Sequence, residues 1–205
     1  MSDKRSAQKA RDEGPLTRAA IVEEAIRLIN EEGLEGVSLR RLAARLDVKA
    51  ASLYWHFKDK ADLLAGMAEF IFLRCLDSVP AHREWPTWMR AYGKALWRGQ
   101  RNTRDFSRLL GIADFPTQQF QFIAQRIRDA MAHLDLPERE AMRLQSSIQA
   151  LITGWAVFAG SPYADDMQKE LDFDSEVMTD MDLLIDGEQL RLQRGAVQSR
   201  ARGRK

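Results

Sequence analysis

Basic and ring-bearing side chains are concentrated in one stretch of this sequence, from Ser38 to Lys60. Six residues of the stretch are Lys or Arg and two are Asp, although the 205-residue chain has a net charge of only +1. Tyr54, Trp55 and His56 are consecutive, and each of their rings carries a polar atom. Lysine and arginine attract phosphate oxygens, and hydroxyl and imidazole groups form hydrogen bonds with them. We therefore predict that this stretch binds nucleic acid.

Three short helices followed by a longer one are predicted to position these side chains. Apolar residues from Ile21 to Ile29 recur at the spacing of one buried helix face, and Gly33 ends that helix. Ser38 is a favourable N-cap for a second helix, a third is predicted over residues 49–55, and Asp59 caps a fourth. The break between the second and third helices is short enough to force a sharp crossing. This is the helix-turn-helix arrangement.

The third helix is predicted to lie in the major groove of DNA. Its leading residues are Lys49, Ala50, Ala51 and Ser52. The alanines permit close approach and offer methyl groups to thymine, and the serine hydroxyl can bond to a base or a phosphate. We expect Tyr54 and His56 to reach the phosphate backbone and Trp55 to lie on the flank of the groove. Lys60, at the start of the next helix, is expected to meet phosphate as a point charge.

A structural interpretation of the same residues competes with DNA binding. In it, Arg40, Arg41 and Arg45 form a solvated helix face, and the three consecutive rings fill a small core. We favour DNA binding because a helix this short cannot direct three adjacent rings inward. The exposure of the rings distinguishes the two interpretations.

The run from Gly36 to Leu64 closely resembles the N-terminal domain of the tetracycline-repressor family, above all in Leu-Tyr-Trp-His-Phe-Lys-Asp-Lys at positions 53–60. The resemblance is strong over residues 16–64. Carried over position by position, it implies DNA contacts from Ser38, Arg40, Ala50, Ala51, Ser52, Tyr54, Trp55, His56 and Lys60. Asp47 stands where many members have glycine. Aspartate tolerates the left-handed conformation, so we expect the turn to form.

The remaining sequence also has helical periodicity, so the predicted fold class is all-α. We predict a helix-turn-helix domain joined to a C-terminal helical bundle, with a loop over residues 161–174. The predicted divisions are a flexible arm (1–15), the DNA-binding domain (16–62), a ligand-binding and dimerisation domain (63–190) and a disordered basic tail (191–205). Residues 191–205 contain six basic and no acidic residues, whereas residues 162–188 contain ten acidic residues and one lysine. The tail is either solubilising or adds nonspecific attraction to phosphate.

The resemblance further implies a small-molecule inducer and a homodimer. Apolar residues with a few polar tips are candidates for lining the inducer pocket, and each also fits an ordinary core. These candidates are Trp88, Met89, Tyr92, Leu96, Phe106, Leu109, Phe120, Ile123 and Trp155. Two apolar stripes are candidates for a four-helix dimer interface, or alternatively for internal core. They are Ile148, Leu151, Ile152, Trp155, Phe158, Val177, Met178, Met181, Leu184 and Ile185.

The expected mechanism is a repressor dimer that binds a palindromic operator and leaves it when an inducer binds. The inducer favours a state in which the helix from Asp59 to about Val79 tilts, which changes the spacing of the two recognition helices. The tetracycline repressor holds its drug through magnesium and imidazole ligands. This chain has Leu76 and Leu109 where those histidines fall. We therefore predict no metal or cofactor, and an apolar or amphipathic inducer.

Other functional classes are less compatible with the sequence. It has no phosphate loop, no nucleophile elbow and no paired histidine and carboxylate on one helix face, so we predict no catalytic residues and no enzyme. An activator, or a regulator without a ligand, remains an open alternative. The single cysteine, Cys75, cannot form an internal disulfide, and no apolar run is long enough to span a membrane. We expect a cytoplasmic protein.

Overall fold

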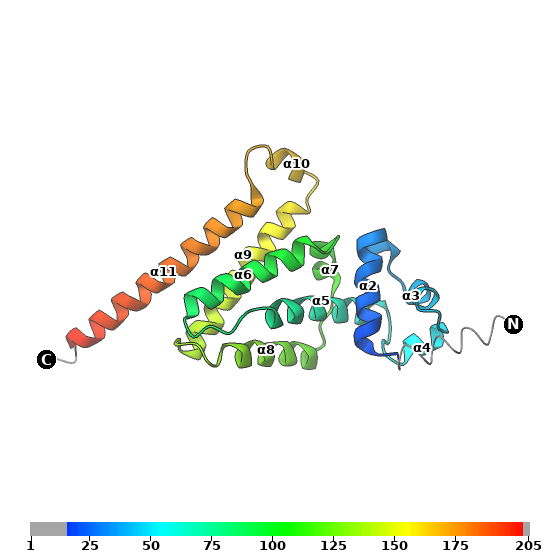
Figure 1. The fold of residues 1–205 in the computed structure, drawn as a ribbon, viewed down its shortest axis with the longest axis horizontal. Helices are drawn as coiled ribbons and strands as arrows, with labels where there is room; N and C mark the ends of the chain where they lie inside the picture. Colours follow the sequence, from blue (N-terminus) through cyan, green and yellow to red (C-terminus); the bar gives the residue numbers. More distant parts are fainter. Residues whose placement is uncertain (1–15, 203–205) are drawn as a thin grey trace. The chain divides into compact units, whose positions relative to one another are not determined.

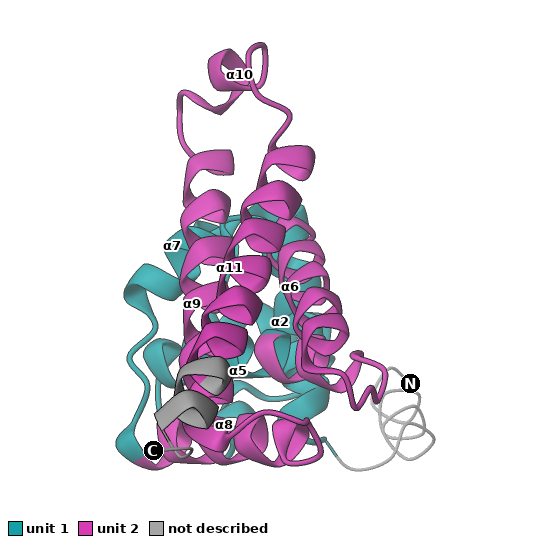
Figure 2. Cartoon of the chain, turned by 90° about the vertical axis from the view of Figure 1, so that its left-hand side faces the viewer, with its two compact units in different colours: residues 1–71, 103–117 teal, residues 72–102, 118–205 magenta. Residues whose placement is uncertain are grey.

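The computed structural model describes residues 16–202, which contain helices and no strand. Figure 1 shows the helices along the chain, and Figure 2 colours the two compact units into which they divide. Unit 1 contains the described part of residues 1–71 together with residues 103–117, and unit 2 contains residues 72–102 with the described part of 118–205. The all-α prediction is confirmed. The expected arm, residues 1–15, lies outside the described residues.

Unit 1 begins with four helical segments whose ends are set by local capping. They are α2 (Arg18–Glu32), the 3-10 turn η1 (Leu34–Gly36), α3 (Leu39–Arg45) and α4 (Ala50–Tyr54). Thr17 caps α2 by accepting the N–H of Ala20, and Gly33 ends it with a φ of 77° that favours glycine. Unit 1 also contains the first residues of α5 (Lys60–Asp77) and the whole of α7 (Phe106–Ile112). Its core is formed by Ile21, Leu28, Leu42, Leu53 and Phe57, all fully buried.

Unit 2 is built on three packed helices, α6 (Trp85–Arg101), α9 (Glu138–Ala159) and α11 (Phe173–Arg202). Figure 2 shows these three helices side by side. Gly93 permits their close approach, because a Cβ there would overlap the Sδ of Met181. The remaining helices are the end of α5, α8 (Thr117–Met131) and the short α10 (Ala164–Met167).

Three acidic residues of α11 form ion pairs with arginines within unit 2. The guanidinium of Arg90 on α6 bonds to Asp182 and Asp186, each at 2.6 Å. Glu188 pairs with Arg143 on α9 and with Arg191 on α11 itself. The hydrogen bonds from these arginines outweigh the opposing effect of burial and lower the pKa of Glu188 to about 2.

The helices and the two units differ from the sequence-based expectations at four places. The expected loop over 161–174 contains α10, and the expected disordered tail from residue 191 is helical as far as Arg202. Residues 203–205 lie outside the described residues. The division between the units falls inside α5, after Ile71, and residues 103–117 belong to the first unit instead of the second. No helix within residues 16–202 is long and apolar enough to cross a membrane.

Candidate nucleic-acid interface

A tight turn joins α3 to α4, as a helix-turn-helix requires. Ser38 caps α3 by accepting the N–H of Arg41 at 3.3 Å, which confirms the predicted N-cap. Asp47 has a φ of 53°, so the predicted left-handed turn forms without glycine. The N–H of Val48 then donates to the carbonyl of Ala43 at 3.0 Å and closes the turn. Leu53 and the neighbouring Phe57 are fully buried and direct the opposite face of α4 outward.

Two of the three consecutive rings are exposed at the C-terminal end of α4, where Tyr54 is the last residue and Trp55 is the C-cap. Trp55 is 90% exposed and Tyr54 is 54% exposed, so these rings do not fill a core. His56 is half-buried. At the leading end of the helix, Lys49 and Ala51 are exposed, while Ala50 and Ser52 are half-buried. The two adjacent exposed rings are therefore available to contact another molecule.

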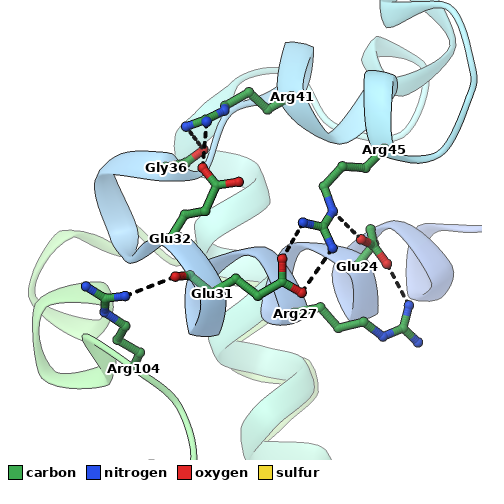
Figure 3. A network of polar contacts seen from close by, with 8 residues as sticks. All are labelled: Glu24, Arg27, Glu31, Glu32, Gly36, Arg41, Arg45 and Arg104. Carbon is green, nitrogen blue, oxygen red and sulfur yellow. Dashed lines mark hydrogen bonds and ion pairs between the residues drawn. The ribbon is translucent and has the colours of Figure 1, made fainter.

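Two arginines counted in the basic stretch are committed to contacts inside unit 1 (Figure 3). Arg41 pairs with Glu32 at 2.6 Å. Arg45 pairs with Glu24 at 2.6 Å and with Glu31 at 2.5 Å, which raises the pKa of its guanidinium. The three carboxylates belong to α2, so these pairs fasten α3 to α2. Neither interpretation of the basic stretch anticipated that these two arginines hold α3 against α2.

The partnered carboxylates show the effect of the arginines. Burial alone raises the pKa of Glu24, but hydrogen bonds from Arg27 and Arg45 outweigh it and leave the pKa below its ordinary value. The hydrogen bond from Arg45 likewise lowers the pKa of Glu31. Both carboxylates are charged at neutral pH and offset the positive charge of the arginines.

Other basic residues around α4 form no ion pair with an acidic side chain within residues 16–202. Arg40, Lys49 and Lys58 are exposed and form no ion pair with any described residue. Lys60 is also exposed, and its Nζ lies 3.5 Å from the carbonyl oxygen of Leu34. The Ser38 hydroxyl oxygen accepts the capping bond, so its O–H can donate to an external acceptor. This set is suited to binding phosphate.

The candidates for the inducer pocket are divided between the two units. Phe106 and Leu109 are buried in unit 1. In unit 2, Trp88, Met89, Tyr92 and Leu96 are buried, Ile123 and Trp155 are half-buried, and Phe120 is 64% exposed. The buried members have the environment expected of core as well as of pocket residues.

Sequence reasoning missed a row of polar side chains between α6 and α9, here called the polar row: Tyr92, Gln100, Gln145, Gln149 and Thr153. The Tyr92 hydroxyl accepts from Gln145 Nε2 at 2.7 Å and donates to Gln149 Oε1 at 3.0 Å. Gln149 and Gln100 both donate to Thr153 Oγ1, at 3.2 and 3.3 Å. Gln100 Oε1 is buried without a hydrogen-bond partner among the described residues. These groups are scattered between Tyr92 and Thr153 in the sequence and share no motif.

The candidates for the dimer interface fall into two sets. Ile148, Ile152, Val177, Met181 and Ile185 are fully buried inside unit 2, so they form internal core. The others are at least partly exposed: Leu151, Trp155, Phe158, Met178 and Leu184. The same two helices also expose Val157, Leu183 and Leu190, which sequence reasoning did not select.

Side chains of the types that ligate metal ions are dispersed within residues 16–202. Residues 16–202 contain no group of three or more His, Cys, Asp or Glu side chains that could hold a metal ion. Burial raises the pKa of the Cys75 thiol to about 11, so this cysteine is protonated at neutral pH and is a poor nucleophile.

Comparison with known proteins agrees with the geometry of α3 and α4. Residues 21–67 match the family model described as bacterial regulatory proteins, tetR family. The chain is 50% identical over 54 residues to the tetracycline repressor protein class C of Escherichia coli, covering 26% of this chain and 25% of that one. It is 36% identical over 92 residues to the class D protein of Escherichia coli, covering 44% and 42%. The match thus spans less than half the length of either relative.

Similarity of fold extends over most of the chain. A substituted TetR from Acinetobacter baumannii AYE, solved in complex with minocycline, superposes with a TM-score of 0.67. The superposition covers 86% of this chain and 99% of that chain at 24% sequence identity. At this level of identity the comparison supports the fold of both units.

Proposed function

We propose that this chain is a transcriptional regulator of the tetR type, not an enzyme, and that it acts as a homodimeric repressor. It binds a palindromic operator through α4 and is released by a small-molecule inducer. The observation that carries the proposal is the exposure of Trp55 beside Tyr54, on a helix whose other face is locked by Leu53.

Base recognition is assigned to the leading end of α4. Ala50 and Ala51 offer methyl groups to thymine, and Ser52 offers a hydroxyl to a base edge or phosphate. Lys49 lies just ahead of the helix and is exposed. Because alanine has no hydrogen-bonding side chain, the local shape of the DNA contributes part of the specificity.

Phosphate binding is assigned to the residues around this end. Ser38 and Arg40 lie at the start of α3, and Lys60 lies at the start of α5. Tyr54 and His56 supply a hydroxyl and an imidazole, and Trp55 packs against the backbone on the flank of the groove. These groups orient the helix and make the affinity depend on salt.

A dimer is proposed because one five-residue recognition helix covers too few base pairs for specific binding. Symmetric regulators bind two half-sites about one helical turn apart. The exposed apolar side chains of α9 and α11 supply a surface for a second copy, with Phe158 on α9 and Leu183 on α11 among them. Burying such side chains in a self-complementary interface is favourable.

The inducer is proposed to be apolar or amphipathic and to bind without a metal. Minocycline is the ligand of the Acinetobacter protein, which is similar to this chain in fold. In this chain Leu76 and Leu109 are leucines with no ligating atom, which argues against a drug held through magnesium. The polar row supplies uncharged hydrogen-bonding groups on α6 and α9, and Gln100 Oε1 still lacks a donor among the described residues. An uncharged molecule with hydrogen-bond donors suits such groups.

Release is assigned to α5, which continues from unit 1 into unit 2 without a break. A ligand that binds more tightly to one tilt of this helix shifts the population toward that tilt, and the two recognition helices of a dimer then no longer match the operator.

The experiment that tests the function is fluorescence anisotropy of the full chain on labelled DNA from upstream of its own gene, with random DNA as competitor. We expect a preferred fragment to bind the wild type, and Trp55→Ala to weaken that binding by about tenfold or more. Tyr163→Ala is the matched control, because Tyr163 is an exposed ring in unit 2, outside the proposed interface. If selection from genomic fragments yields no preferred site, operator binding is ruled out.

A further inference from the structure

One arginine joins three parts of unit 1 that are separate in the sequence. The Arg18 guanidinium donates through Nη1 to the carbonyl oxygen of His56 at 2.5 Å and through Nη2 to Asp62 Oδ1 at 2.8 Å. Its carbon Cζ lies 4.1 Å from the centre of the Phe57 ring. Arg18 is the first residue of α2, and Asp62 is in the first turn of α5. His56 and Phe57 follow Trp55, the C-cap of α4.

These contacts fall at the weakest part of the recognition helix. A five-residue helix has almost no stability of its own, so its direction depends on its attachments. Its C-terminal end carries partial negative charge, where a cation is favourable. The backbone N–H of His56 donates to the carbonyl oxygen of Leu53 at 3.0 Å. The carbonyl oxygen of His56 accepts a hydrogen bond from Arg18, so both backbone groups of His56 have partners.

Asp62 extends the attachment to the segment that follows. Its carboxylate also accepts the N–H of Lys58 at 2.9 Å, while its own N–H donates to Asp59 Oδ1 at 2.9 Å. The backbone from His56 to Asp62 is thus closed into a loop with Arg18 on one side. Arginine suits this place because its planar group forms two directional bonds and still stacks on a ring, which lysine does not.

We propose that Arg18 is a positioning residue that sets the direction of α4, and hence the presentation of Tyr54 and Trp55 to DNA. It acts through the His56 carbonyl, the Phe57 ring and the Asp62 carboxylate, and it makes no contact with DNA itself. Within unit 1, Arg41 and Arg45 fasten α3 to α2, and Arg18 does the same for α4. The effect of Arg18 on DNA binding rests on the proposed function, whereas its effect on the direction of α4 does not.

The test compares wild type, Arg18→Ala and Arg18→Lys with Arg108→Ala. Arg108 is another unit 1 arginine in an ion pair, with Glu35 at 2.7 Å, and lies outside the proposed interface. The first measurement is amide hydrogen exchange, which needs no DNA. We expect exchange over residues 52–57 to become about tenfold faster in Arg18→Ala and Arg18→Lys and to stay at the wild-type rate in Arg108→Ala.

The second measurement is binding to the selected operator and to random DNA over a salt series. We expect Arg18→Ala to lose about tenfold or more in operator affinity, with random-DNA affinity and the salt slope unchanged. If Arg18→Ala lowered the affinity for both the operator and random DNA, and reduced the slope of log affinity against log salt concentration by about one, Arg18 would be a phosphate contact. That result would overturn the proposal. So would wild-type exchange in Arg18→Ala, or full function in Arg18→Lys. A wild type without a preferred site refutes the proposed function, and the exchange result then decides the role of Arg18 alone.

Discussion

The carboxylate of Asp105 accepts a hydrogen bond from the backbone N–H of Leu34 at 2.9 Å, across 71 positions of sequence. The preceding residue, Arg104, donates its own N–H to Asn30 Oδ1 at 2.8 Å. Residues 103–117 belong to unit 1, although the chain on either side of them belongs to unit 2. These bonds hold the end of α2 and the start of η1 to the segment that follows α6 in sequence.

Replacing Asp105 is expected to weaken unit 1. Asp105→Ala leaves the Leu34 N–H without its acceptor and places alanine at a φ of 56°, so we expect a loss of about 1–2 kcal/mol in the free energy of unfolding. Asp105→Asn keeps an acceptor oxygen and tolerates the left-handed backbone, so it should lose less. Urea unfolding measures both, with Asp114→Ala as control. Equal losses in the Ala and Asn variants would rule out this role for the carboxylate.

Glu188 is expected to make stability depend on acid pH. Its pKa is about 2 in the folded protein against an ordinary value of 4.5, so its contribution is complete above about pH 4.5 and disappears as the pH falls toward 2. Glu188→Gln should cost about 1–2 kcal/mol at pH 7, and this difference should vanish near pH 2. Unfolding measured from pH 7 to pH 2 checks this. A constant difference across the range would contradict the ion-pair explanation.

The close approach of α6 and α11 at Gly93 gives a prediction about packing. Gly93→Ala makes a methyl group overlap Met181 Sδ, which must move within a full core, and we expect a loss of about 1–3 kcal/mol. Gly154 on α9 has open space around its Cβ position and serves as the matched control. There alanine should stabilise the helix by up to about 1 kcal/mol. Thermal unfolding distinguishes the two, and similar melting temperatures would refute the packing argument.

In the polar row, removing a hydrogen-bonded group should cost more stability than removing a group without a partner. Tyr92→Phe leaves Gln145 Nε2 buried without its acceptor and should cost about 1–2 kcal/mol. Gln100→Met removes the unpartnered Oε1 together with one weak bond and should cost less than about 1 kcal/mol, or nothing. Chemical denaturation of each variant measures the difference. A larger loss in Gln100→Met would mean that Oε1 has a partner in solution.

The proposed dimer is tested by introducing charge on its surface. Leu183 is 67% exposed on α11, so Leu183→Glu should leave the monomer folded but oppose association through the cost of burying a carboxylate. Sedimentation velocity should show a dimer for wild type and for Tyr163→Glu, and a monomer for Leu183→Glu. A dimer that persists in Leu183→Glu places the interface elsewhere.

The helix-turn-helix could be predicted because its determinants are local. Ser38 caps a residue three positions away, Asp59 does the same, and Asp47 forms its turn from its own backbone preference. Amphipathic spacing likewise predicted that Leu53 faces inward, and the density of rings predicted that Trp55 does not.

The tail shows where a prediction from composition was misleading. Residues 191–202 contain glycine and serine and no long apolar run, so they were expected to be disordered, yet α11 continues through them. Extending an existing helix costs far less than starting one, and arginine, leucine, glutamine and alanine are good helix formers.

By itself, the sequence determined which residues start, end and turn the helices and which rings face outward, because those choices involve neighbours within four positions. Only the tertiary structure decided how charged and polar side chains are used. Arg41 and Arg45 pair with α2, Arg18 bonds to the end of α4, and Asp105 reaches Leu34. Each of these partners was one of many carboxylates or backbone groups in the chain. The choice among them depends on which surfaces the packed core brings together, and no spacing in the sequence encodes that.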